Sequence, residues 1–295
     1  MEKILEIRGL TRHYGRIRAV HNLDMDVGRG QVYGILGPNG SGKTTTLSVI
    51  MGVVHQQQGS YSWFGNARGS GWKRRVGSLI EVPNFYPYLS LVQNLMIAAR
   101  IKEVPDNDID RVLEVAGLTE RRNYPYRTLS LGMKQRLAMA SVLLGDPEVM
   151  VLDEPTNGLD PEGIAEVRGI ISGEAEKGKT VILASHILGE VEKVCSHVAV
   201  LKGGELIASG RVEELLGTDR MFRLSAPDTG LLGELLVRAG MVKTLENKGG
   251  EILVTCGASI SAADINRFAF DNDIVLTGLV PVRKSLESHF LELVR

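Results

Sequence analysis

A glycine-rich turn between an apolar run and a helical pattern constrains this chain more than any other feature. The apolar run covers residues 32–36, and the segment from Gly37 to Thr44 matches G-x-x-x-x-G-K-[ST]. Without Cβ atoms, Gly37, Gly40 and Gly42 allow successive backbone N–H groups to turn inward. Together with the positive end of the following helix, these groups form a cradle for an anion. The alternative is a glycine-rich connection that binds nothing.

The residues of this loop have expected roles toward a nucleotide phosphate. Lys43 is expected to reach the β- and γ-phosphates, and the Thr44 hydroxyl is expected to bind Mg²⁺. We therefore expect ATP and Mg²⁺ as cofactors. The expected contacts of the loop and first helical turn are Gly37, Pro38, Asn39, Gly40, Ser41, Gly42, Lys43, Thr44 and Thr45.

An acidic pair follows a second apolar run. Residues 149–152 are continuously apolar, as in a strand buried on both faces, and Asp153 and Glu154 follow directly. Asp153 is expected to hold Mg²⁺, directly or through water, opposite Thr44. Glu154 faces a different direction and is expected to orient or deprotonate the attacking water. In a chain without the phosphate loop, such a pair would indicate a structural ion pair instead.

Composition narrows the class of protein. The 295 residues carry a formal net charge of −1, so no basic excess indicates a nucleic-acid partner. The two cysteines, Cys195 and Cys256, are isolated, which fits a reducing cytosol. No secretory signal is visible, and no run approaches the roughly 18 apolar residues of a membrane span. If a membrane is involved, we expect another chain to cross it.

The order of patterns divides the chain into parts. We expect an ATP-binding domain over residues 1–217, in which residues 88–145 form a helical subdomain, because helical periodicity replaces the α/β alternation there. Strands are expected within 2–36 and at 59–64, 76–80, 149–152, 180–183, 197–201 and 205–208. Helices are expected at 44–51, 109–116 and 133–144, from Pro161, and from 186 to about 194.

The pattern of the sequence changes beyond about residue 217. We expect residues 218–295 to form a C-terminal accessory α/β domain, with Ser261 and Asp264 in a capping box. This part carries no catalytic pattern. Its expected strands are 221–225, 252–255 and 274–279, and its expected helices are 231–238, 262–270 and 286–294.

Two groups of aromatic residues have both a functional and a structural interpretation. Tyr14 lies on the first connection, where its ring could stack on a base or could be half-buried in the fold. The loop at 82–88 holds Phe85, Tyr86 and Tyr88 between two prolines. These rings could dock a partner or pad the edge of a core.

Five motifs in one order resemble the ATP-binding subunits of ABC transporters, over residues 2 to about 215. Besides the phosphate loop, residues 129–136 (Leu-Ser-Leu-Gly-Met-Lys-Gln-Arg) resemble the family's signature. Residues 152–160 resemble the family's segment that contains the acidic pair. His186 falls at the switch histidine and Tyr14 at the adenine-stacking aromatic. The resemblance implies a P-loop (RecA-like) α/β ATPase core, an antiparallel β subdomain, a helical signature subdomain and a small C-terminal α/β appendage.

The resemblance also implies an assembly. Two copies would pack head to tail as a homodimer in the ATP state, with each nucleotide between the phosphate loop of one copy and the signature of the other. Ser130, Gly132 and Gln135 would supply the signature contacts. Asp160 would contact the second copy. A separate transmembrane permease is the implied partner, which places this chain at the cytoplasmic face of the cell membrane.

Within each copy, the family's pattern assigns further roles. His186 would touch the γ-phosphate and support Glu154, and these two residues with Lys43 form the expected catalytic set. Val20 joins Tyr14 among the expected nucleotide contacts. Closure on ATP and opening after hydrolysis would drive the membrane partner.

Two departures from the family's pattern stand out. Leu131 replaces the first glycine of the common signature Leu-Ser-Gly-Gly-Gln, and Met133 begins the stretch before Gln135. Glu81 stands where the family usually has glutamine, so we expect it near the metal. The alternative is a loop glutamate that faces solvent or the membrane partner. The stretch from 77 to 81, with Phe85, resembles the bacitracin-resistance and lantibiotic-immunity branch, which exports peptide antibiotics. The end of the chain, with Ser285-Leu286-Glu287, resembles the tail of that branch.

These inferences predict the ATP-hydrolysing motor subunit of an ABC transporter that exports a peptide antibiotic or a related amphiphile. The alternative is a non-transport ABC ATPase. A translation factor of that kind usually carries two ATP domains in one chain, and a DNA-repair ATPase inserts a long coiled coil; neither feature is seen here. A regulatory protein that binds nucleotide without turnover is disfavoured by Glu154 and His186.

Overall fold

The computed structural model describes residues 2–65, 71–81, 84–216 and 219–282. The chain divides into two compact units, Met1–Arg211 and Val212–Arg295. The division thus falls before the boundary between 217 and 218 that the sequence indicated. The expected helix at 286–294, the Ser285-Leu286-Glu287 stretch and residues 82–83 of the aromatic loop lie outside the described residues.

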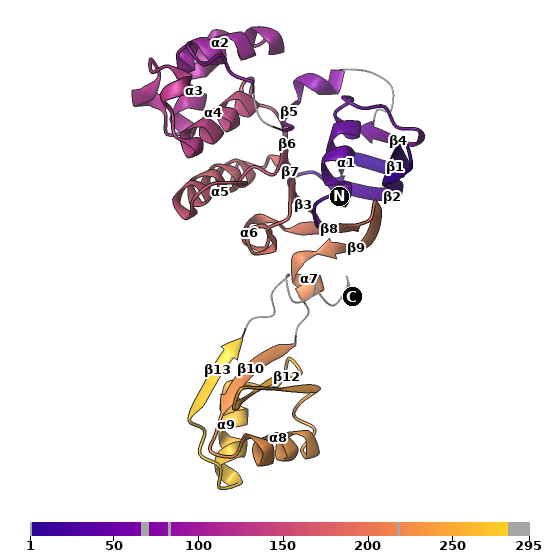
Figure 1. Ribbon diagram of the computed structural model, residues 1–295, viewed down its shortest axis with the longest axis vertical. Helices are drawn as coiled ribbons and strands as arrows, with labels where there is room; N and C mark the ends of the chain where they lie inside the picture. Colours follow the sequence, from indigo (N-terminus) through magenta and orange to yellow (C-terminus); the bar gives the residue numbers. More distant parts are fainter. Residues whose placement is uncertain (1, 66–70, 82–83, 217–218, 283–295) are drawn as a thin grey trace. The chain divides into compact units, whose positions relative to one another are not determined.

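A six-stranded sheet forms the centre of the first unit (Figure 1). Its order is β5-β6-β7-β3-β8-β9; β9 alone runs antiparallel to its neighbour. The bounds are β3 (Val32–Leu36), β5 (Val76–Leu79), β6 (Val149–Asp153), β7 (Thr180–Ser185), β8 (His197–Lys202) and β9 (Glu205–Arg211). Every residue of β3, β6 and β7 is buried, as expected for parallel strands covered on both faces.

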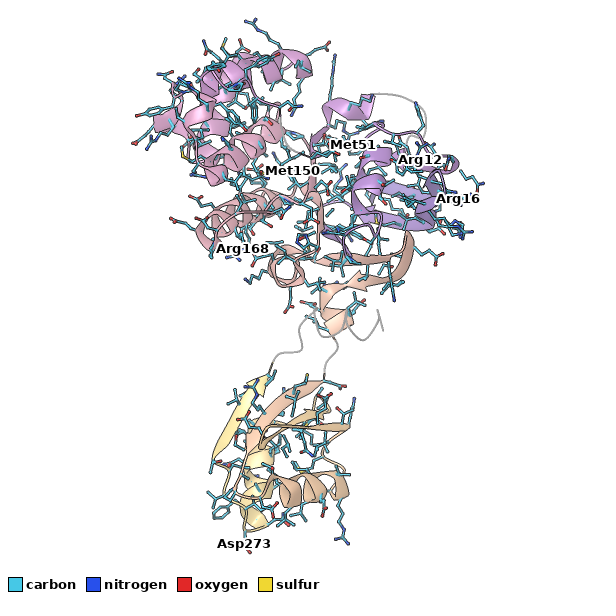
Figure 2. The ribbon with its side chains drawn as sticks, viewed as in Figure 1. Arg12, Arg16, Met51, Met150, Arg168 and Asp273 are labelled. Carbon is cyan, nitrogen blue, oxygen red and sulfur yellow. The ribbon has the colours of Figure 1, made fainter. Side chains whose placement is uncertain are left out.

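Helices cover both faces of this sheet. α1 (Lys43–Ile50) lies on one face, and α5 (Pro161–Glu176) and α6 (Leu188–Val194) lie on the other (Figure 1). α6 packs so closely on β3 that a Cβ at Gly34 would lie 2.7 Å from Cγ1 of Val191. Arg168, labelled on α5 in Figure 2, forms a 3.0 Å ion pair with Glu190 of α6. The two helices on that face are therefore linked by charge.

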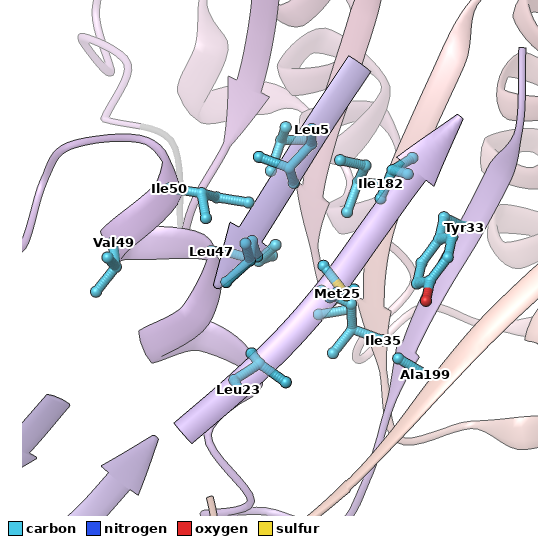
Figure 3. Packing of buried hydrophobic residues seen from close by; sticks show 14 of the residues in the cluster. Leu5, Leu23, Met25, Tyr33, Ile35, Leu47, Val49, Ile50, Ile182 and Ala199 are labelled. Carbon is cyan, nitrogen blue, oxygen red and sulfur yellow. The ribbon is translucent and has the colours of Figure 1, made fainter. Parts of the chain in front are cut away.

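A three-stranded antiparallel sheet closes over α1. Its order is β2-β1-β4, with β1 (Lys3–Tyr14), β2 (Ile17–Gly28) and β4 (Gln58–Trp63). Figure 3 shows Leu47 and Ile50 of α1 in one buried cluster with Leu5 and Met25 of this sheet. The indole nitrogen of Trp63 donates a 2.8 Å hydrogen bond to the Ile50 carbonyl oxygen. The helix that follows the phosphate loop is thus fixed between two sheets.

The helical subdomain contains α2 (Leu91–Lys102), α3 (Ile109–Val115) and α4 (Leu131–Leu143). We expected the last helix to begin at Met133, but it begins two positions earlier. Ser130 is its N-cap, and the Ser130 hydroxyl accepts a 3.2 Å hydrogen bond from the Met133 backbone N–H. The cap satisfies a free donor of the first turn, which fixes the helix start. Within the described parts of the chain, no helix is both long and apolar enough to span a membrane.

The second unit contains a four-stranded antiparallel sheet with the order β11-β12-β10-β13. The chain runs through it as strand, helix, strand, strand, helix, strand, which is the split βαβ topology of ferredoxin-like folds. A short helix, α7 (Val212–Leu216), precedes it. The bounds are β10 (Arg220–Ser225), α8 (Thr229–Arg238), β11 (Thr244–Lys248), β12 (Glu251–Cys256), α9 (Ala262–Asp271) and β13 (Gly278–Val282). The predicted capping box of Ser261 and Asp264 is confirmed at the start of α9.

One expectation for this unit was wrong. The strand expected at 274–279 begins only at Gly278, because the chain after α9 turns through Asp273, whose φ is 60°. Ile274 is buried and its backbone N–H bonds the Ala269 carbonyl oxygen, so its apolar side chain completes the helix packing. The sequence analysis also missed β11, a polar strand at the edge of the sheet.

Candidate active site

The candidate site lies where three neighbouring strands end. β7 pairs in parallel with both β3 and β6, with Leu36 opposite Ser185 and Asp153 opposite Ala184. The segments that follow these strands therefore leave the same edge of the sheet. They are the loop at 37–42, the acidic pair and His186.

The glycines bring the loop backbone close to its neighbours. Gly42 has a φ of 103°, and a Cβ there would lie 2.2 Å from the Ala19 carbonyl oxygen. Gly42 is the N-cap of α1, and no side-chain hydrogen bond caps this helix. The buried hydroxyl of Ser41 has no hydrogen-bond partner among the described residues. The site thus combines an uncapped helix start with an unsatisfied hydroxyl, which suits an anion that accepts hydrogen bonds.

The Lys43 ammonium contacts the loop that precedes it. Its side chain is only 6% exposed, and Nζ donates hydrogen bonds to the carbonyl oxygens of Gly37 (2.8 Å) and Pro38 (3.3 Å). Nζ also lies 3.4 Å from Oε1 of Glu154. A buried charge requires such partners. The charged oxygens of a phosphate are a chemically equivalent substitute for them.

Glu154 lies between the loop and the end of β7. Its Oε2 is 2.8 Å from Nδ1 of His186, while its Oε1 faces Lys43. Its backbone adopts a φ of 47°, an uncommon value for a residue with a side chain, and its N–H donates to the Ala184 carbonyl oxygen. The carboxylate is therefore held from two sides by groups on two other segments.

Asp153 is a buried carboxylate that lacks a full set of partners. Burial raises its pKa, a hydrogen bond from Thr44 opposes that rise, and the negative charges of Glu154 and Glu81 add to it. Its Oδ1 has no hydrogen-bond partner among the described residues. A divalent cation would relieve this shortage, since carboxylate and hydroxyl oxygens are the ligands that Mg²⁺ prefers. Asp153 and Thr44 thus fit Mg²⁺.

Glu81 lies at the same edge of the sheet. It follows β5, which pairs with β6 so that Leu79 lies opposite Leu152. Its charge is close enough to raise the pKa of Asp153, and its φ is 62°. Among the described residues, no group of three His, Cys, Asp or Glu side chains could hold a metal ion unaided. A metal here would need additional ligands, such as substrate phosphate oxygens.

Tyr14 and Val20 lie on the antiparallel sheet beside the loop. Tyr14 ends β1 and its ring is 44% exposed, with the Arg12 guanidinium 4.8 Å from the ring centroid. Val20 of β2 is fully buried, and a Cβ at Gly42 would lie 3.5 Å from its Cγ2. Val20 therefore packs beneath the loop, whereas Tyr14 offers an accessible ring.

The residues of the expected signature lie on a different element. Ser130, Gly132 and Gln135 occupy the first turns of α4, and Ser130 is exposed. A Cβ at Gly132 would lie 3.9 Å from the Cα of Gly163 in α5, whose N-cap is Asp160. The structure thus groups the signature with the start of α5, apart from the loop and strand ends described above.

The predicted aromatic loop is part of a larger aromatic surface, whose second segment at 121–127 was not predicted from the sequence. The loop at 84–89 is attached to residues 121–127: the Tyr126 and Arg127 N–H groups donate to the carbonyl oxygens of Leu89 and Pro87. Arg127 lies 5.2 Å from the Tyr88 ring centroid. We name this the tyrosine surface; its residues are Phe85, Tyr86, Tyr88, Arg121, Tyr124, Tyr126 and Arg127. The tyrosines and arginines that lie close together in the sequence at 121–127 could have indicated this second segment.

A buried amide fixes the shape of this surface. Asn94 is 2% exposed, and its Oδ1 accepts a 2.7 Å hydrogen bond from the Tyr86 N–H. Its Nδ2 donates to the carbonyl oxygens of Tyr86 and Ser90. Tyr86 and Tyr88 remain 59% and 78% exposed. The rings are therefore presented to solvent on a fixed backbone.

Comparison with known proteins agrees with this geometry. The family model described as ABC transporter matches residues 20–157. The bacitracin transport ATP-binding protein BcrA of Bacillus licheniformis is 35% identical over 302 residues, covering 100% of this chain and 98% of the relative. The lantibiotic transport ATP-binding protein SrtF of Streptococcus pyogenes is 36% identical over 225 residues, covering 74% and 98%.

A solved structure shares the architecture of the first unit. The ABC transporter component cbiO1 from Clostridium perfringens superposes with a TM-score of 0.66 at 26% identity, covering 81% of this chain and 97% of that one. Sequence and structure therefore lead to one family. The chain belongs to the ABC transporter family, as one of its ATP-binding subunits, which hydrolyse ATP to power transport.

Proposed function

We propose that this protein is the motor subunit of an exporter for a peptide antibiotic or a related amphiphile. One observation carries the motor role: the Glu154 carboxylate is held between Lys43 and His186 where adjacent parallel strands end. The substrate class is supported by relatives named for bacitracin and lantibiotic transport. Such a peptide would not need to bind this subunit, which would supply only the energy for transport.

ATP binding would replace contacts that the chain now makes with itself. The β- and γ-phosphates would take Lys43 Nζ from the Gly37 and Pro38 carbonyl oxygens, and the backbone N–H groups of the loop at 37–45 would surround them. Asp153 and Thr44 would hold Mg²⁺, which screens the phosphate charge. The Tyr14 ring would stack on the adenine.

Hydrolysis would follow from the release of Glu154. When the phosphates draw Lys43 away, the Glu154 oxygen that faced Lys43 would become free for the attacking water, while His186 would keep the other oxygen. It orients a water molecule for attack on the γ-phosphorus and takes one of its protons, while the bond to the bridging oxygen breaks. His186 would hold Glu154 in place through Nδ1–H and would contact the γ-phosphate.

Complete sites would require two copies of the chain. Ser130 is exposed at the start of α4, and the neighbouring Leu131 is an apolar side chain with 57% exposure. In a head-to-tail homodimer, Ser130, Gly132 and Gln135 of one copy would face the phosphate loop of the other, and Asp160 would lie at the seam. Leu131 would then be removed from water.

The tyrosine surface would bind the transmembrane permease and so hold this subunit at the cytoplasmic face of the membrane. Tyrosine and arginine are enriched at the energetic centres of protein interfaces. The surface also reaches the signature helix, because Lys134 of α4 lies 5.4 Å from the Tyr126 ring centroid. Movement of α4 on ATP binding would therefore change the shape that the permease contacts.

The substrate class is tested in cells that carry the gene for this chain and a permease. Deletion of the gene should increase sensitivity to bacitracin or to a lantibiotic at least several-fold. The wild-type gene should restore resistance, whereas a Lys43→Ala copy should not, because its loop cannot hold the phosphates. Unchanged sensitivity to a panel of membrane-acting peptides would remove peptide antibiotics from the proposal.

The docking role of the tyrosine surface is tested by copurification with the permease. Replacing both Tyr86 and Tyr88 by alanine should abolish copurification, since their exposed rings contribute roughly 2 kcal/mol or more each at an interface centre. Basal ATP hydrolysis by the isolated subunit should be unchanged. The matched control replaces Tyr61, a tyrosine of β4, with phenylalanine. If the double variant unfolds, the rings are structural and the docking proposal fails.

Glu81 is proposed to make ATP binding depend strongly on the metal. A glutamate offers a charged oxygen to Mg²⁺, a stronger ligand than a glutamine carbonyl, but it repels the γ-phosphate when no metal is present. We therefore expect Glu81→Gln to bind metal-free ATP more tightly than the wild type does, on the order of tenfold for the removal of one charge near the γ-phosphate.

The measurement is a titration of ATP affinity in EDTA and in excess Mg²⁺ for both proteins. Both should bind MgATP, so the ratio of the two affinities should be larger for the wild type. Glu103→Gln, at an exposed glutamate after α2, is the control and should leave the ratio unchanged. An equal ratio for wild type and Glu81→Gln would place Glu81 away from the metal.

A further inference from the structure

Arg12 lies next to the tyrosine proposed to bind the base. It precedes Tyr14 by two positions in β1. The guanidinium carbon is 4.8 Å from the centroid of the Tyr14 ring, within the range of a cation–π interaction. Arg12 thus covers part of one face of this exposed ring.

The guanidinium is itself held in place. Its Nη1 donates a 3.1 Å hydrogen bond to the His55 carbonyl oxygen, in the segment that follows α1. Its Nε is buried without a hydrogen-bond partner among the described residues. Another arginine of this hairpin, Arg16, is exposed in the turn between β1 and β2 (Figure 2). Among the described residues, Arg12 is the one cation that lies over the Tyr14 ring.

An exposed tyrosine at a strand end is free to rotate, and stacking on a base requires one orientation of the ring. A cation fixed over one face removes part of that freedom before the base arrives. Tyr14 as a whole remains 44% exposed, which leaves accessible surface for a base. The His55 contact connects this orientation to the helix that begins at the phosphate loop.

We propose that Arg12 is a positioning residue for base recognition: its guanidinium holds one face of the Tyr14 ring so that the other face meets the adenine. The inference rests on the proposed stacking role of Tyr14. It assigns Arg12 to the base and not to the phosphates.

The test compares two ligands of the full chain in excess Mg²⁺. ATP carries the base, whereas inorganic tripolyphosphate carries only the phosphates. Arg12→Ala should weaken ATP about two- to fivefold, the effect of losing one exposed cation–π contact, and should leave tripolyphosphate affinity unchanged. Arg12→Lys should restore part of the ATP affinity, and the control Arg16→Ala should change neither ligand.

A second comparison separates positioning from an independent contact. In a Tyr14→Ala background, Arg12→Ala should have no further effect on ATP, because no ring remains to position. Equal weakening of both ligands, tighter ATP binding by Arg12→Ala, or additive losses in the double variant would each overturn the proposal. Failure of the proposed nucleotide site looks different, since the wild type would then bind neither ligand at the loop that contains Lys43.

Discussion

The parallel pairing of β7 with both β3 and β6 is the constraint on which the site depends. It brings the phosphate loop, the acidic pair and His186 to one edge of the sheet, although these segments lie far apart in the sequence. The pairing is rigid because the three strands are buried on both faces. A shift in register between β6 and β7 would separate Glu154 from both Lys43 and His186. The chemistry is therefore set by the sheet, and the loop residues act within it.

The charged groups of the site are paired with one another, and a bound nucleotide could replace these partners. Lys43 is neutralised by two carbonyl oxygens and Glu154, so its burial needs no ligand. Asp153 is the exception: burial raises its pKa, so the folded protein keeps that proton to higher pH than the unfolded chain. Its favourable contribution to stability is present at low pH and is lost as the pH rises through the folded pKa. A bound cation would favour the charged form of Asp153, which links stability to function.

Local motifs were predictable from the sequence, and contacts between distant segments were not. The phosphate loop and the Ser261 cap depend on neighbours in the chain, so spacing and residue type were sufficient. The start of α4 was placed late because the N-cap contribution of Ser130 was not used for the boundary. The contact of Arg12 with Tyr14 and the pairing of loop 84–89 with 121–127 depend on tertiary packing. The edge strand β11 lacks apolar alternation, so no periodic signal marked it.

The most direct test of the account measures ATP hydrolysis and assembly of Glu154→Gln. We expect the variant to bind ATP, to lose hydrolysis by about 10²–10⁴-fold and to accumulate as an ATP-bound dimer in size-exclusion chromatography, because the water is no longer activated. Glu205→Gln, at an exposed glutamate of β9, should hydrolyse and elute as the wild type does. Normal hydrolysis by Glu154→Gln would contradict the central claim that the carboxylate held between Lys43 and His186 activates the attacking water.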